Sequence, residues 1–225
     1  MRYRDSLDWL LPRVAARRVL YIGTIDDDPD NARKHPAIHR ALAGKAKAIT
    51  GIYRHEEQAA ELRAAGFPVE SGEVGDLDPS LRFEVIVAAD NLEHVDNAGW
   101  FLKTLERHLE PGGTVLVTTP NPASFGRMAE LLLLGRMKAN RAHTCWYTGQ
   151  VLDQLAARVG LRVVETQPID EMHKYHGPAA RRGRPLSRRL ASTGLVGLNR
   201  LACLGWPQLA ETYGFVLARE PGRAP

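Results

Sequence analysis

The chain has 225 residues, 44% of them apolar and 25% charged, which is typical of one globular domain. No apolar run approaches the length that crosses a bilayer, so no transmembrane segment is expected. No signal peptide is evident and the two cysteines match no ligand spacing, so a cytoplasmic location is expected. The net charge of +4 comes from six basic residues between Lys174 and Arg189, without which the chain would carry −2, so a generally basic, nucleic-acid-binding fold is excluded too.

Apolar runs alternate with helical patterns along the chain. Strands are expected at residues 18–23, 48–53, 67–72, 83–88, 114–119, 161–166 and 212–218. Helices are expected at residues 6–16, 35–46, 56–65, 98–109 and 149–159, and a loop at residues 24–36. This alternation predicts right-handed crossovers and a mostly parallel sheet with helices on both faces.

In an open parallel sheet, ligands bind at the carboxyl ends of the strands, near the point where the strand order reverses. Here that point lies between the first and fourth predicted strands. The loops expected to meet there are residues 23–28, 53–56, 73–76, 90–94 and 119–122.

The most specific pattern lies in residues 83–122. It contains FEVIVAADNLEHV at residues 83–95, FLKTLERHLEPGG at 101–113 and VLVTTPNP at 115–122. These segments, with residues 143–148, closely resemble the class I S-adenosylmethionine-dependent methyltransferases, and within them the group that includes the ubiquinone-biosynthesis O-methyltransferases.

The resemblance implies one Rossmann-like α/β domain over residues 1–225. Its sheet would have seven strands, mostly parallel, with one antiparallel C-terminal strand. A lid-like segment would cover about residues 122–147, and a basic and apolar insertion about residues 170–210. S-adenosylmethionine is the implied cofactor, and no metal is implied.

Six residues stand at the family's cofactor-binding positions: Gly23, Thr24, Tyr53, Glu73, Asp90 and Glu93. The family's glycine-rich turn is altered, because Tyr21 replaces an acid and Ile25 and Asp27 replace later glycines. Tyr53 occupies the place of the acid that accepts the ribose hydroxyls. The acceptor side is closer to the pattern, and there His143 is the preferred general base, with His94 second.

Three functions remain open. The first is methyl transfer to a small-molecule or sugar-linked acceptor. The second is a methyltransferase-fold protein that has lost methyl transfer and serves as a partner subunit or uses the pocket for other chemistry. The third, nucleic-acid binding through Lys174 to Arg189, ranks lowest, since an acidic protein or an anionic surface fits those charges as well.

Overall fold

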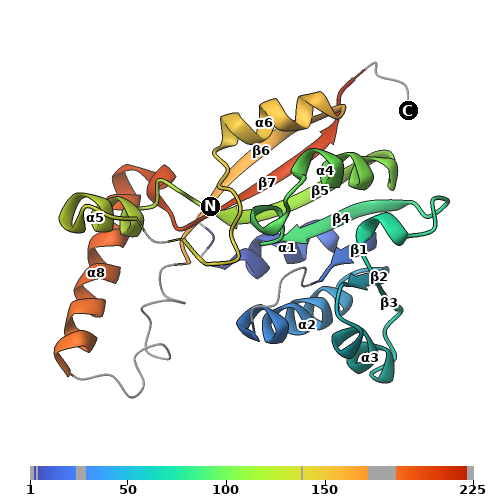
Figure 1. Ribbon diagram of the computed structural model, residues 1–225, viewed down its shortest axis with the longest axis horizontal. Helices are drawn as coiled ribbons and strands as arrows, with labels where there is room; N and C mark the ends of the chain where they lie inside the picture. The colour runs from blue at the N-terminus through green and yellow to red at the C-terminus, as the bar shows by residue number, and fades with distance from the viewer. Residues whose placement is uncertain (1–2, 4, 24–28, 138, 172–185, 222–225) are drawn as a thin grey trace.

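The computed structural model describes residues 3, 5–23, 29–137, 139–171 and 186–221 (Figure 1). Seven strands form one sheet in the order β3-β2-β1-β4-β5-β7-β6. They are β1 (Arg18–Ile22), β2 (Ala48–Tyr53), β3 (Val69–Ser71), β4 (Phe83–Ala89), β5 (Leu109–Pro120), β6 (Leu161–Ile169) and β7 (Thr212–Arg219). The α-helices are α1 (Ser6–Val14), α2 (Pro29–Ala43), α3 (Glu56–Ala64), α4 (Ala98–Arg107), α5 (Phe125–Leu134), α6 (Gly149–Arg158) and α8 (Leu186–Gly205).

The direction of the strands confirms the expected topology. Strands β1 to β5 pair in parallel, whereas β7 runs antiparallel to both of its neighbours, β5 and β6. The order of the strands reverses between β1 and β4, as expected. The carboxyl ends of these two strands therefore mark the place where a ligand would sit.

Successive residues of β1 face opposite sides of the sheet and enter two separate cores. Leu20 and Ile22 belong to the core under α4 and α6, while Val19 and Tyr21 belong to the core under α1, α2 and α3 (Figure 1). Both faces of β1 are thus buried, which is why its sequence is continuously apolar.

Helix α2 begins earlier than expected, so the predicted loop over residues 24–36 is wrong in its second half. The helix runs from Pro29 to Ala43. Pro29 occupies the first helical position, where a missing N–H costs no intrahelical bond. The early start brings His35 and His39 to the buried side of α2, facing the sheet.

Helices α5 and α8 pack against each other beside the sheet and project from it (Figure 1). They carry most of the exposed large apolar side chains of the described chain, namely Leu131, Leu132, Leu133, Leu134, Leu198, Leu201 and Leu204. Among the described residues, no helix has the length and apolarity needed to cross a membrane.

Candidate functional site

The site is built at the carboxyl ends of β1 and β4. Asn91, which follows β4, is fully buried, and its side-chain amide donates to the carbonyl of Ile22 at 3.0 Å. This bond ties the two strand ends together just before Gly23. The residues after β4 are therefore held rigidly against the turn that leaves β1.

Asp90 is fixed by three contacts. Its backbone has a φ of 51°, in the left-handed region that aspartate tolerates better than most residues. Its backbone N–H donates to the Thr118 hydroxyl at 3.0 Å, and that hydroxyl donates to the Asp90 carboxylate at 2.7 Å. Lys34 of α2 forms an ion pair with the same carboxylate. This pair joins α2 to β4 across the switch point.

Glu93 lies in the short helix η2 (Leu92–His94) and is only 1% exposed. Within the described part of the chain, its Oε2 atom has no hydrogen-bond partner. Burial, together with the nearby charge of Asp90, raises the pKa of the Glu93 carboxyl to about 8. A buried carboxyl of this kind is costly unless something offsets it, which makes Glu93 a candidate functional residue.

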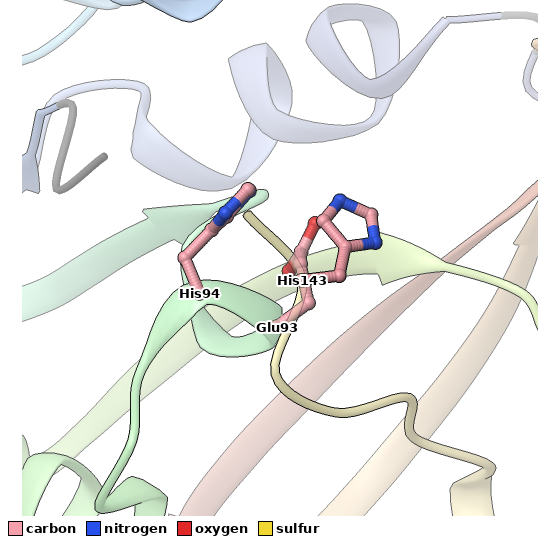
Figure 2. Close-up of side chains that lie close together, drawn as sticks. All are labelled: Glu93, His94 and His143. Carbon is pink, nitrogen blue, oxygen red and sulfur yellow. The ribbon is translucent and has the colours of Figure 1, made fainter. Parts of the chain in front are cut away.

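His94 and His143 lie beside Glu93. Their rings are edge to face with centroids 4.8 Å apart. The loop that carries His143 is anchored to η2, because the backbone N–H of Thr144 donates to the carbonyl of Glu93 at 2.8 Å. Figure 2 shows the side chains of Glu93, His94 and His143 gathered over the strand ends. We call these three residues the Glu-His-His cluster.

A cavity of about 270 Å³ opens next to the cluster, and His94 lines it. Its other lining residues come from the ends of β1 and β2, from η1 (Val74–Asp76) and from the start of α4. Ile22, Ile52 and Phe101 give it apolar walls, while Glu73 and Asn97 lie at its polar side. Apolar walls with a few polar groups suit a flat, partly polar ring such as a nucleobase.

Two phenols near this cavity are directed away from it. The hydroxyl of Tyr21 hydrogen-bonds Nδ1 of His35 at 2.7 Å, and the hydroxyl of Tyr53 hydrogen-bonds Nδ1 of His39 at 3.2 Å. Both tyrosines are fully buried, and burial raises both phenol pKa values. The two hydrogen-bonded pairs therefore join the sheet to α2.

The ring of Tyr53 also covers Gly23. A Cβ atom at Gly23 would lie 2.2 Å from Cδ1 of Tyr53, which leaves no room for any side chain. Of the predicted cofactor-binding residues, Glu73 lines the cavity. The side chain of Tyr53 instead fills the space beside Gly23. Thr24 lies outside the described residues.

The structure brings together Glu93, His94 and His143, each of which the resemblance had singled out. It also reveals two residues that the sequence reasoning missed as parts of the site, Lys34 and His35. Lys34 and His35 had fallen in the stretch expected to be a loop. Helical spacing from Pro29 onward was the signal that could have revealed them.

The residues fit the implied cofactor at its adenosyl end. The apolar walls made by Ile52 and Phe101 suit an adenine ring, and Glu73 offers acceptor oxygens beside it. At the turn that follows β1, the residues differ from the family's usual arrangement. Tyr53 stands where the family has an acid, and its phenol is hydrogen-bonded to His39 of α2, so no carboxylate is present there to accept the ribose hydroxyls.

Comparison with known proteins agrees with this geometry. A family model described as a methyltransferase domain matches residues 13–166, which is more than half of the chain. No curated protein matches. Several solved structures share the fold at 15–18% identity.

One similar structure is a putative methyltransferase in complex with the Trm112 methyltransferase activator of Haloferax volcanii (TM-score 0.63, 15% identity, covering 98% of this chain and 89% of that one). Another is an S-adenosylmethionine-dependent methyltransferase from Mesorhizobium loti (TM-score 0.57, 17% identity, covering 96% of this chain and 96% of that one). A third is the [4+2]-cyclase SpnF (TM-score 0.59, 18% identity, covering 96% of this chain and 80% of that one).

Proposed function

Because this chain belongs to the methyltransferase domain family, whose cofactor is S-adenosylmethionine, we propose that it is an active enzyme that methylates a hydroxyl group of a small-molecule or sugar-linked acceptor. The observation that carries the proposal is the Glu-His-His cluster, whose member His94 also lines the cavity that fits the adenosyl group. Groups that handle the acceptor would thus adjoin the group that supplies the methyl.

S-adenosylmethionine, when bound, supplies an electrophilic methyl group. The protein's part is to hold the acceptor oxygen in line with that methyl group and to exclude water. Proton removal makes a hydroxyl oxygen a better nucleophile. His143 is the preferred proton acceptor, with His94 second, because both are half-buried and lie beside the cavity.

The test of this proposal is methyl transfer from radiolabelled S-adenosylmethionine to a library of hydroxylated metabolites and sugar-linked compounds. We expect His143→Ala to lower kcat by about 100-fold or more, as removal of a general base does, with a small effect on cofactor affinity. Full activity in that variant would remove His143 from the mechanism.

A second candidate function is supported by the Tyr53 ring over Gly23. Because Tyr53 fills the space beside Gly23, this chain is also compatible with a pocket used for other chemistry, or with a partner subunit that does not transfer methyl groups. The [4+2]-cyclase SpnF shares this fold, and its name describes a reaction other than methyl transfer. Cofactor binding without methyl transfer to any acceptor would favour this candidate.

For a partner, we favour an anionic lipid surface. Exposed leucines at positions 198, 201 and 204 recur at helical spacing on α8, and Trp206 follows them. The sequence immediately before and within the start of α8 contains the six basic residues between Lys174 and Arg189. An apolar helical face next to a basic segment is the pattern of proteins that lie on membranes. A cytoplasmic location agrees with Cys145 and Cys203, which are not joined by a disulfide.

A further inference from the structure

The Glu-His-His cluster has the geometry of a metal site. One ligand atom from each of Glu93, His94 and His143 can be chosen so that all three lie within 4.8 Å of one another. Bonds of about 2.0–2.2 Å hold two ligand atoms of one ion at most about 4.4 Å apart. Small rotations of these side chains would therefore bring all three atoms onto one ion.

The surroundings of His94 favour the same role. Its Nδ1 lies 3.2 Å from the carbonyl oxygen of Ala142, and a carbonyl can only accept, so Nδ1 carries the proton. Nε2 is then the unprotonated ring nitrogen, the one whose lone pair can bind a metal ion. Histidines that bind metals usually donate their other N–H to a carbonyl or carboxylate in this way, which fixes the ring.

The loop that supplies His143 is held in place before any ion arrives. Both the backbone N–H and the hydroxyl of Thr144 donate to the carbonyl of Glu93, at 2.8 and 3.1 Å. The bond between His94 and Ala142 adds a further link between the same two segments. Residues 93–94 and 142–144, about fifty positions apart in sequence, thus form one preorganised unit.

Glu93 is the ligand that most needs a cation. Its side chain is buried and its Oε2 has no hydrogen-bond partner among the described residues. The amine of Lys34 is paired with Asp90 instead. A cation between Glu93 and the two imidazoles would offset the cost of burying a carboxylate there.

We propose that Glu93, His94 and His143 bind one divalent transition-metal ion of the zinc class. Two imidazoles and one carboxylate are the ligand set of open zinc and non-haem iron sites, in which further positions remain for water or substrate. Magnesium is a poorer match, because it prefers an all-oxygen shell.

The role of the ion rests on the proposed function, whereas the site itself does not. Bound at an open position, the acceptor hydroxyl would have a lowered pKa and a fixed orientation. His143 would then act as a ligand, since one nitrogen lone pair cannot bind both a metal and a proton. The ion and the general base are therefore alternative roles for His143, and a binding measurement distinguishes them.

The experiment is a titration of metal-stripped protein with Co²⁺, followed by visible absorption, and with Zn²⁺, followed by calorimetry. We expect one ion per chain, a Co²⁺ absorption band typical of nitrogen and oxygen ligands, and displacement of Co²⁺ by Zn²⁺. His143→Ala and the isosteric Glu93→Gln should each weaken binding by at least about 10-fold. The control is His108→Ala, since His108 bonds Leu81 at the opposite end of β4.

The proposal is overturned if the wild-type protein takes up no stoichiometric ion, or if both variants bind it as tightly as the wild type while circular dichroism shows them folded. S-adenosylhomocysteine binding is measured on the same stripped protein. Cofactor binding without metal binding overturns the metal site and leaves the proposed function standing. Metal binding without cofactor binding supports the site and contradicts the proposed function.

Discussion

The ring of Tyr53 lies where a side chain at Gly23 would begin, with three ring atoms 2.2–2.6 Å from the position of a Cβ atom. Glycine is thus required at the end of β1 by a neighbour in this chain, independently of any approach by a ligand. The phenol continues past Gly23 to His39 and the carbonyl of His35, so it links β1, β2 and α2.

This contact predicts that the cost of Gly23→Ala depends on Tyr53. In the wild-type background we expect a loss of about 1–3 kcal/mol in the free energy of unfolding, because the methyl group overlaps the ring. In a Tyr53→Ala background most of that cost should disappear. Urea denaturation of the four variants measures the coupling. Gly44→Ala is the control, since a Cβ there meets only ordinary contacts, and an equal cost in both backgrounds would refute the contact.

Buried His39 predicts a loss of stability in mild acid. Burial, with a smaller effect of Arg40, lowers the pKa of His39 to about 4. The unfolded chain then binds a proton near pH 6.5 that the folded chain refuses, so stability falls as the pH drops from about 6.5 to 4, by at most about 3 kcal/mol. His39→Phe should lack this decline, and the control His55→Gln should keep it. Unfolding measured at pH 7, 5.5 and 4.5 checks the prediction, which fails if the decline is the same in His39→Phe.

Glu106 predicts a different acid response. Its burial would raise the pKa, but hydrogen bonds from Lys103 at 2.8 Å and Arg219 at 2.7 Å outweigh it and lower the pKa. A lowered pKa gives stability that is present above the unfolded pKa of about 4.3 and is lost as the pH falls through the folded pKa. Glu106→Gln should cost about 1–2 kcal/mol at pH 7 and progressively less below pH 4. The control Glu61→Gln, at an exposed position, should change the free energy of unfolding little at any pH. If Glu106→Gln is still less stable than the wild type at pH 3 by the same amount as at pH 7, the lowered pKa of Glu106 is contradicted.

The proposed lipid surface predicts salt-sensitive binding to vesicles of phosphatidylglycerol and weak binding to vesicles of phosphatidylcholine alone. Replacing both Leu201 and Leu204 with aspartate should weaken binding by at least about 10-fold, because both side chains are exposed on α8. Val151→Asp, an exposed change on α6, is the matched control. Sedimentation with vesicles measures the effect. Equal binding by the double variant, or none by the wild type, would exclude this surface.

The sequence predicted the centre of the fold well, because β4, α4 and β5 are defined by local signals. Strand β4 is apolar at every position except Glu84, and α4 has one apolar face. Pro111 with the two following glycines separates α4 from the interior part of β5. The start of α2 was missed because three aspartates and two prolines gave a loop-like composition, while the contacts that stabilise the helix, from His35 and His39, are tertiary.

The sequence named residues of the candidate site but carried no signal for how they converge. Glu93, His94 and His143 were all named from the resemblance, but their convergence depends on the bond from Thr144 to the carbonyl of Glu93, which has no sequence signal. The direction of Tyr53 was predictable from alternation along β2. Position 53 shares a face of the sheet with Ile49 and Gly51, and Gly51 leaves space there for a ring.

The most direct test of the central claim is calorimetric titration of the purified chain with S-adenosylhomocysteine. We expect saturable binding of one molecule per chain, and at least about a 10-fold loss of affinity in Val95→Trp, which fills the cavity beside Ile52 and Phe101. Val151→Trp, on the exposed face of α6, should bind as the wild type does. No binding by the wild type, or undiminished binding by a folded Val95→Trp, would contradict the assignment of this cavity to the cofactor of a methyltransferase.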